Sequence, residues 1–548
     1  MSLAINHFFT TMRCNGIFSK LLQLKGIKVI RTKYLIGAIT AAMVVTNAVI
    51  AETPTPNFNH KIPDVIMTPD QVETRLGTLN FEDGRPTKAT ADLLFDNLDF
   101  MRGVEVFLNF IPATSLEGIR SGMAEMGVDA PNKVMYFDEL MDSNPLFLTG
   151  NTDTVYASAI FDLKRDGPMV VEIPPGLGPT TVNDAFFRFV TDMGVPGPDR
   201  GLGGKYLILP PDYTGNLDPP EGGLFTMLDD TNYYVSKSSS YVNWFIARAF
   251  LEDGQPDAAV KLYNEGLRIY PLSQKDNPPQ MEFISGSKQV FNTIHANTYE
   301  FYEELDHVLQ YEPIGLIDPE LRGLAASIGL KKGTEFAPDS RMEAILRDAV
   351  QVGNATARSI WLHQRDESAY LYENSGWYTA FVGNDYQWLI DDGIGGRNLD
   401  ARTMFFYIAT VNTPAMVWKL IGAGSQYAQN VTDSNGEFLD GGKTYKLNIP
   451  KDAPAKKFWS VVVYDPQTRS ELQTSQPYPG LNSVRDEMIT KEDGSIDLYF
   501  GPTAPEGLEA NWIETVPGKG WFTLLRLYSP LEPWFEKTWR PGEIELIE

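Results

Sequence analysis

Apolar residues recur along the chain with two different periods. Between residues 87 and 112 they recur at steps of three and four, which predicts an amphipathic helix, and Pro112 is expected to end it. The helical stripe consists of Leu94, Leu98, Met101, Val104 and Leu108. From about Phe147 the period becomes two, which predicts a strand over residues 154–163. One face of that strand carries Val155, Ala157, Ala159 and Phe161.

The short apolar runs that follow are bounded by glycine and proline, which predicts further strands. They read GPMVVEIPPG, AFFRFVTDMG and GKYLILPPD. Because no helical pattern separates them, the strands are expected to be antiparallel and to pack as a sandwich. A helical period returns between residues 236 and 375, over SYVNWFIARAFLEDG, PDAAVKLYNEGLRIYPL, EFYEELDHVLQYEP and RMEAILRDAVQVGNATARSIWLHQRD.

The last part of the chain, from residue 376, is predicted to be β again. KTYKLNI alternates apolar and polar residues, and KFWSVVVYD is a continuous apolar run suited to a strand buried on both faces. GSIDLYFG and GWFTLLRLYSP complete the set. The expected fold class is multidomain α+β, with a helix, an antiparallel β-sandwich, a helical domain and a second β-sandwich in that order.

The first 51 residues have the layout of a secretory signal peptide. Six Lys and Arg precede the first acidic residue, Glu52, and an apolar stretch over residues 34–51 ends in the pattern Val49-Ile50-Ala51. This layout predicts cleavage after Ala51 and a periplasmic or secreted protein. A membrane anchor is the alternative, but the stretch is short beside the roughly 20 apolar residues that a span needs. Residues 52–70 are proline-rich and predict an extended arm.

The net charge and the cysteine content exclude several classes of partner and of site. The chain has 46 Lys and Arg against 71 Asp and Glu, for a net charge of −25, and loss of the six basic residues of the leader lowers it to −31. Such a charge repels nucleic-acid phosphates and anionic lipid, so we expect no nucleic-acid partner and no membrane span after cleavage. The one cysteine, Cys14, lies in the leader, which excludes disulfides and thiolate sites from the mature chain.

Familiar catalytic and metal-binding signatures are missing. The histidines beyond residue 51 show no H-x-H or H-E-x-x-H spacing, and the sequence has neither a G-x-S-x-G elbow nor a phosphate-binding loop. We therefore predict no metal and no cofactor.

Carboxylates are the remaining catalytic option, because paired acids can carry general acid–base chemistry. The segment TVNDAFFRFVTD places Asp184, Arg188 and Asp192 at even spacing, on one face of a predicted strand. An arginine between two acids favours a structural ion-pair ladder, since the cation keeps both carboxylates ionised. A glycosidase-like hydrolase with the candidate acids Asp153, Asp184 and Asp192 is kept as an alternative.

The stretch NTDTVYASAIFDL, which begins at Asn151, is the most distinctive polar feature. Asn and Asp side chains readily bond to the backbone two residues on, so this sequence predicts an Asx-type turn that leads into a strand. A structural turn explains every residue type in it. The functional alternative is a polar pocket at the sandwich edge, with the candidate ligand-binding residues Asn151, Asp153, Tyr156 and Arg188.

Several motifs together resemble a pair of known families. NTDTVYASAIFDL, PMVVEIP and DRGLGGKYLILPPDY are similar to the family called domain of unknown function 1254. LDGGKTYKLNIP, KFWSVVVYD, DGSIDLYFGP, NWIETVPGKGWFTLLRLYSPL and KTWRP resemble its partner, domain of unknown function 1214. The resemblance implies an exported bacterial protein with an immunoglobulin-like sandwich, a helical domain and a jelly-roll sandwich. It carries over no reaction and no catalytic residue.

The predicted domains follow from the periods and the resemblance together. They are the signal peptide (1–51), the arm (52–70), a helical segment with the first sandwich (71–240), the helical domain (241–375) and the jelly-roll sandwich (376–548). The leading hypothesis for function is a small-molecule or saccharide site between sandwich and helical domains. The alternatives are the carboxylate-dependent hydrolase and a structural or assembly protein, and the oligomeric state stays open.

Overall fold

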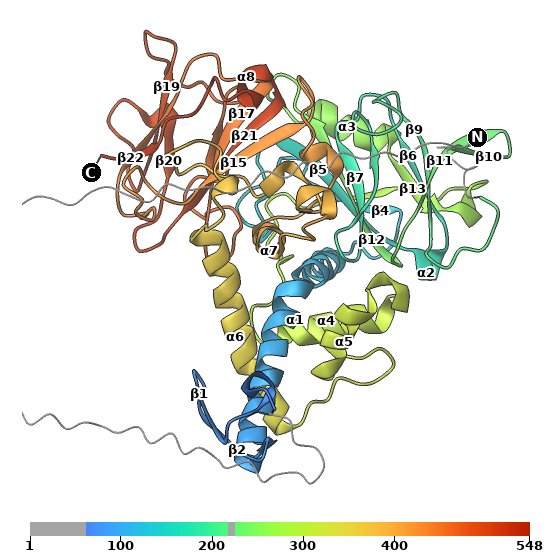
Figure 1. Ribbon diagram of the computed structural model, residues 1–548. Coiled ribbons are helices and arrows are strands. Elements are labelled where there is room, and N and C mark those ends of the chain that lie inside the picture. The colour runs from blue at the N-terminus through green and yellow to red at the C-terminus, as the bar shows by residue number, and fades with distance from the viewer. Residues whose placement is uncertain (1–61, 218–224, 548) are drawn as a thin grey trace, which may run out of the picture. The chain divides into compact units, whose positions relative to one another are not determined.

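The computed structural model describes residues 62–217 and 225–547 (Figure 1). The chain divides into two compact units, residues 1–69 and 70–548. The described part of the first unit contains one turn of 3-10 helix, Asp64–Ile66, whereas the predicted signal peptide and most of the predicted arm lie outside the described residues. Within the described ranges, no helix is both long and apolar enough to cross a membrane. All elements named from this point on belong to the second unit.

A small antiparallel sheet opens the second unit and a long helix follows it. The strands are β1 (Gln71–Thr74), β2 (Gly77–Glu82) and β3 (Arg85–Pro86). Helix α1 (Lys88–Glu125) begins where the side chain of Thr87 accepts a hydrogen bond from the backbone N–H of Thr90 (3.3 Å). This is the N-cap arrangement that hydroxyl side chains favour.

The prediction that Pro112 ends this helix is wrong, because α1 continues through it to Glu125. Proline removes one N–H from a helix interior and costs roughly 3 kcal/mol there. The carbonyl of Leu108, which loses that N–H, receives a hydrogen bond from the hydroxyl of Thr403 instead (3.5 Å). Every residue from 109 to 117 is also buried, so packing on all sides holds the helix together across the proline.

The N-terminal sandwich consists of two sheets on either side of an apolar core. Its strands are β4 (Lys133–Tyr136), β5 (Thr154–Asp162), β6 (Met169–Ile173), β7 (Thr180–Asp184), β8 (Phe189–Met193), β9 (Gly204–Leu209), β10 (Phe225–Leu228), β11 (Thr231–Lys237), β12 (Val242–Phe250), β13 (Arg268–Pro271) and β14 (Glu282–Ser285). The strand orders are β14-β4-β5-β12-β7-β8 and β10-β11-β9-β6-β13. Most neighbours are antiparallel, as predicted, while β14 pairs with β4 and β11 with β9 in parallel.

Residues 242–250 form β12, which corrects the prediction of a helix over SYVNWFIARAFLEDG. The strand lies between β5 and β7, and residues 243–249 are all buried. A strand covered on both faces loses the alternation of apolar and polar residues that identifies a half-buried strand. Its continuous apolar run therefore looks like a buried helix in the sequence.

Asp184 and Asp192 lie on two different strands, which corrects the prediction that one strand carries both of them with Arg188. Asp184 ends β7, and its Oδ1 accepts hydrogen bonds from the backbone N–H groups of Phe186 (2.8 Å) and Arg188 (2.8 Å). This side-chain-capped turn stops the strand and places Arg188 in the connection to β8.

In the part of the chain that is described, four helices pack against α1. They are α4 (Glu300–Tyr311), α5 (Pro319–Ser327), α6 (Ser340–Leu362) and α7 (Leu399–Ile408). Helices α2 (Leu163–Asp166) and α3 (Asp257–Gly266) pack against strands of the first sandwich instead. Single 3-10 turns occupy Leu272–Gln274, Ile314–Leu316, Glu367–Ala369, Val382–Asn384, Asp391–Gly393, Pro414–Met416 and Glu509–Asn511. Helices were predicted at α3, α4 and α6, and the structure confirms them. The helix predicted over PDAAVKLYNEGLRIYPL ends at Gly266, however, and Arg268–Pro271 form strand β13.

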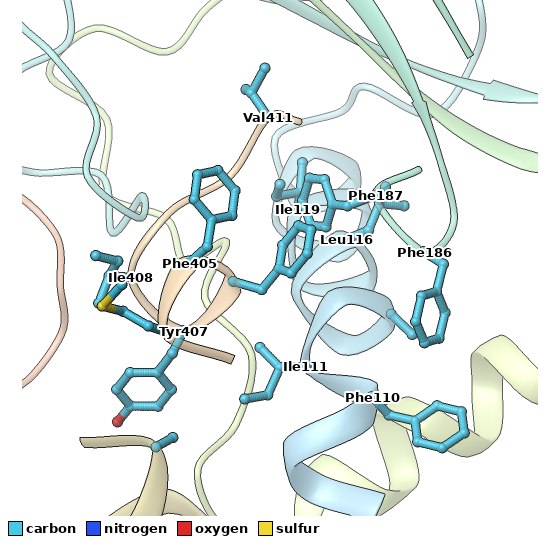
Figure 2. Packing of buried hydrophobic residues seen from close by; sticks show 14 of the residues in the cluster. Phe110, Ile111, Leu116, Ile119, Phe186, Phe187, Phe405, Tyr407, Ile408 and Val411 are labelled. Carbon is cyan, nitrogen blue, oxygen red and sulfur yellow. The ribbon is translucent and has the colours of Figure 1, made fainter. Parts of the chain in front are cut away.

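An aromatic core joins α1 and α7 to the N-terminal sandwich. Figure 2 shows Phe186 and Phe187, from the turn between β7 and β8, beside apolar side chains of α1. Phe187 stacks on Phe406 (5.4 Å between ring centroids) and meets Trp244 of β12 edge to face (5.8 Å). The helices and the first sandwich therefore share one core.

The C-terminal sandwich has two four-stranded sheets around a second apolar core. Its strands are β15 (Ser425–Asn430), β16 (Tyr445–Ile449), β17 (Ala455–Tyr464), β18 (Gly480–Asn482), β19 (Ile496–Gly501), β20 (Trp512–Glu514), β21 (Phe522–Pro530) and β22 (Ile544–Leu546), and helix α8 (Glu532–Phe535) follows β21. The orders are β15-β21-β17-β18 and β20-β19-β16-β22. The predicted strands β16, β17, β19 and β21 are confirmed, and so is the mixed α+β class.

Candidate ligand-binding site

Residues Asn151 to Thr154 form the side-chain-stabilised turn that the sequence predicts. The Oδ1 atom of Asn151 accepts hydrogen bonds from the backbone N–H groups of Asp153 (2.9 Å) and Thr154 (3.1 Å). The Nδ2 atom of Asn151 donates to the hydroxyl of Tyr156 in β5. All four turn residues are fully buried. A polar turn withdrawn from solvent in this way needs partners elsewhere in the chain.

Those partners come from the C-terminal sandwich. The carboxylate of Asp153 accepts hydrogen bonds from the hydroxyl of Ser460 on β17, from Nδ2 of Asn482 on β18 (3.0 Å) and from the hydroxyl of Tyr528 on β21 (3.3 Å). We call these four side chains the Asp153 joint. It fastens the first sandwich to the second through one carboxylate.

Arg526 of β21 is buried beside the joint, with 4% of its surface exposed. Its Nη2 atom donates to the backbone carbonyls of Thr149 (2.7 Å) and Gly150 (3.0 Å) and to the hydroxyl of Tyr464 (2.7 Å). Its Nε atom is buried and has no hydrogen-bond partner among the described residues. The guanidinium thus holds the segment just before the turn through Nη2, and its buried Nε is left without a partner in the described chain.

Arg248 of β12 is 9% exposed and has fewer partners still. Its Nη1 atom donates to the hydroxyl of Tyr427 on β15 (3.2 Å), and this is its one side-chain hydrogen bond to the described part of the chain. Over the same residues, neither Arg248 nor Arg526 has a carboxylate oxygen within 4.0 Å. Because a buried charge is normally paired, two such arginines in one place point to a function.

A cavity of about 510 Å³ lies beside Arg248, between β7, β8 and β12 of the first sandwich and β15 of the second. We call it the Arg248 cavity. Its charged and polar lining includes Arg200, Asp192, Thr413 and Tyr427, and its apolar lining consists of Pro179, Val195, Pro196, Ile246, Val411, Ala415, Met416, Trp418, Leu420 and Ala423.

A second cavity, of about 80 Å³, also borders Arg248 and Tyr427 and extends to Tyr156 and Arg526. We call it the Arg526 cavity. Its other walls are apolar side chains, threonines and Gln429. The two cavities therefore meet at Arg248 and Tyr427.

Two titratable groups at the cavities, Asp192 and Tyr427, have shifted pKa values. Burial raises the pKa of Asp192 to about 6, although the hydroxyls of Thr413 and Thr181 oppose the rise. The Oδ2 atom of Asp192 accepts a hydrogen bond from Thr413 Oγ1 (2.7 Å), whereas Oδ1 is buried without a partner among the described residues. Burial also raises the pKa of Tyr427, but the positive charges of Arg248 and Arg526 outweigh it and the net pKa lies below its usual value.

Asp192→Asn is expected to stabilise the protein at neutral pH. A carboxyl whose folded pKa is raised, here from 3.8 to about 6, contributes its full stability below the lower value and loses it as the pH rises through the upper one. The neutral amide avoids that loss. We expect the free energy of unfolding to rise by about 2 kcal/mol near pH 7.5 and to change little near pH 4. Urea unfolding at both pH values measures this.

The matched control is Asp348→Asn, at an exposed position of α6. Its effect on the free energy of unfolding should be small and equal at both pH values. An Asp192→Asn effect with the same size at both pH values would contradict the assigned titration.

Three of the four predicted ligand-binding residues come together in the structure. Tyr156 lines the Arg526 cavity, Asn151 holds its hydroxyl, and Asp153 lies in the adjoining joint. Arg188 does not join them, because it is exposed and its Nη1 atom donates to the backbone carbonyl of Leu316 (2.5 Å). It borders neither cavity.

The candidate acids of the hydrolase alternative are not brought to one place. Asp192 lines the Arg248 cavity, but Asp153 is held in the joint and Asp184 caps a turn, and neither of these two lines a cavity named above. Among the described residues, no group of three His, Cys, Asp or Glu side chains is placed to hold a metal ion. His295 is buried, and burial together with Arg469 lowers its pKa to about 3.

Sequence reasoning missed Arg248, Arg526 and Tyr427. A signal for the arginines is present in VNWFIARAF and FTLLRLYSP, where a single cation interrupts an otherwise apolar strand. Such a charge needs a partner, and the partner is not visible nearby in the sequence.

Comparison with known families agrees with the motifs. Residues 131–271 match the sequence model of a protein family of unknown function, DUF1254, and residues 424–532 match that of a second one, DUF1214. The chain contains both domains. The DUF1254 segment spans β4 to β13 and the DUF1214 segment spans β15 to β21, so the Asp153 joint links one to the other.

Two solved structures are similar to the chain. The VPA0106 protein from Vibrio parahaemolyticus is 16% identical, with a TM-score of 0.48 over 82% of this chain and all of that one. A putative uncharacterized protein from Burkholderia cenocepacia is 11% identical, with a TM-score of 0.36 over 83% of this chain and 96% of that one. No curated protein matches the chain.

Proposed function

We propose that the protein binds a small, largely apolar molecule in the Arg248 cavity. The cavity itself carries the proposal, since about 510 Å³ falls within the roughly 300–1,000 Å³ of small-molecule sites. Its walls are mainly apolar, and Arg248, Asp192 and Tyr427 converge on it. A few polar groups in an apolar wall are what such sites use to orient a ligand.

The composition of the cavity favours an apolar ligand over a saccharide. Each sugar hydroxyl that enters such a site needs a hydrogen-bond partner, and apolar side chains supply none. The site also differs in place from the sequence-based hypothesis of a site against the helical domain. Its walls come from the two sandwiches and from the loop after α7.

Neither alternative function has a comparable observation in its favour. A carboxylate-dependent hydrolase needs two acids at the substrate, and of its three candidates Asp192 alone borders the Arg248 cavity. A structural or assembly protein has no use for a cavity that holds a buried, unpaired arginine.

The proposal is tested by thermal-shift measurements and native mass spectrometry against two panels. One panel contains straight-chain and aryl alcohols, amides, amines and carboxylates, and the other contains mono- and disaccharides. Members of the first panel should bind and raise the melting temperature. Ala423→Phe, which fills the Arg248 cavity, should abolish the shift.

The matched control is Ala326→Phe, which fills a separate hollow beside α5 and should leave binding intact. Binding by saccharides alone, or a shift that survives Ala423→Phe, would refute the proposal.

We also propose the finer assignments that the resemblance implies. The two-sheet architecture of each sandwich supports an immunoglobulin-like first sandwich and a jelly-roll second one. The predicted boundary at residue 240 falls inside the first sandwich, which β12, β13 and β14 extend to Ser285, and α7, which packs on α1, lies beyond the predicted boundary at residue 375. The basic-then-apolar leader supports export to the periplasm or beyond, with cleavage after Ala51. Edman sequencing of the mature protein from the native host tests the cleavage site.

A further inference from the structure

We propose that the ligand is an apolar monocarboxylic acid whose carboxylate is bound by Arg248, with Arg526 behind it. This inference rests on the proposed function and adds the chemical class of the ligand. The head group would occupy the Arg526 cavity and the apolar body the larger Arg248 cavity, because the two meet at Arg248.

Arg248 has donors to spare at the wall of both cavities. A guanidinium has five N–H bonds, and one of those on Arg248 has a partner among the described residues, the hydroxyl of Tyr427. The side chain is nevertheless nine-tenths buried. Unmet donors of a buried cation destabilise a fold, and Arg248 has no described carboxylate within 4.0 Å to offset this. Since it borders both cavities, a ligand is the partner within reach.

The Arg526 cavity is electrostatically suited to an anion. Two arginines line it, and its lining contains no aspartate or glutamate. Arg526 contributes a second positive charge and a buried Nε without a partner, and the hydroxyls of Tyr156 and Tyr427 lie at the same wall. Two guanidiniums with nearby hydroxyl groups form a favourable setting for a carboxylate, which accepts two parallel N–H bonds.

The balance of charge favours a single negative charge on the ligand. The buried carboxylate of Asp153 accepts a hydrogen bond from Tyr528, two residues after Arg526 on β21, and the larger cavity is lined by Asp192 as well as by Arg200. These acids already offset part of the charge of the two arginines. A carboxylate adds one negative charge, whereas a phosphate monoester adds nearly two. The small head-group space, about 80 Å³, also suits a planar carboxylate.

Matched probes distinguish the contribution of the ligand's head group to affinity from that of its apolar body. Isothermal titration of the full chain with octanoate, octan-1-ol, octylamine and octyl phosphate varies the head group on one apolar chain, and 3-phenylpropionate with its alcohol repeats the test on an aryl body. We expect the carboxylates to bind at least about tenfold more tightly than the alcohols, the amine and the phosphate.

Substitutions of two residues that line the cavity should change the preference for carboxylates over alcohols in opposite directions. Arg248→Met keeps an unbranched apolar stem and removes the charged guanidinium, so it should weaken carboxylate binding about tenfold or more and leave the alcohols unaffected. Asp192→Asn removes a like charge from the cavity and should tighten carboxylate binding several-fold at neutral pH. If Arg248→Met fails to fold, Arg248→Lys keeps the charge without the planar fork and should give an intermediate loss.

The outcomes distinguish this inference from the proposed function. If octan-1-ol binds as tightly as octanoate, or if Arg248→Met leaves the preference unchanged, the carboxylate assignment is overturned and the apolar site stands. If octyl phosphate binds more tightly than octanoate, the ligand is a phosphate ester instead of a carboxylate. If no member of either series binds, both the assignment and the proposed function fail.

Discussion

Asp153→Ala is expected to lower the free energy of unfolding by about 3–5 kcal/mol. The carboxylate is fully buried and accepts hydrogen bonds from Ser460, Asn482 and Tyr528, each on a different strand of the C-terminal sandwich. Its removal leaves three polar groups without an acceptor, and each such group costs about 1–3 kcal/mol. Urea unfolding followed by tryptophan fluorescence and circular dichroism measures the loss.

Two control variants isolate the role of the joint. Ser460→Ala removes one donor and should cost about 1 kcal/mol. Asp199→Ala removes another buried acid, whose partners Gly194, Gly203 and Tyr206 all lie in the first sandwich. Asp153→Ala should therefore split unfolding into two steps while Asp199→Ala does not. A loss below about 1 kcal/mol for Asp153→Ala would contradict the joint.

Trp361→Ala is expected to lower the free energy of unfolding by about 3–5 kcal/mol, because it opens a large cavity in the core. Trp361 is fully buried on α6, and its ring lies 4.8 Å from that of Phe522 on β21 and 6.4 Å from that of Tyr407 on α7. Its Nε1 atom donates to Oε1 of Gln429 on β15 (3.2 Å). Thermal unfolding by calorimetry measures the loss.

Trp418→Ala is the matched control for this substitution. Trp418 is 53% exposed, so its removal should cost less than about 1 kcal/mol. Because Trp418 lines the Arg248 cavity, the same variant should weaken ligand binding. Equal losses of stability from the two tryptophans would contradict the core position assigned to Trp361.

The predictable parts of the fold are those whose burial pattern is visible within one short segment of the sequence. Strand β16 alternates buried and half-buried residues, and the sequence shows the same alternation. Strand β12 is covered on both faces, so it leaves no alternation from which to predict it. The continuation of α1 through Pro112 depends on Thr403, a contact that no local pattern contains.

The same distinction between local patterns and contacts of distant segments holds for the candidate site. The turn at Asn151 was predictable because its hydrogen bonds span two and three residues. The partners of Asp153 lie 307, 329 and 375 residues away, so sequence spacing carried no sign of them. Arg188 was included because acids flank it in the sequence, but the turn that Asp184 caps separates it from the cavities.

The Asp153 joint has a consequence for the ancestry of this protein. A gene truncated after the first segment would encode a sheet that lacks the hydrogen bonds of Ser460, Asn482 and Tyr528 to Asp153, and the second segment alone would lack the same bonds. Recombination that separates the halves therefore removes contacts that both sandwiches share, which favours the inheritance of the two segments together.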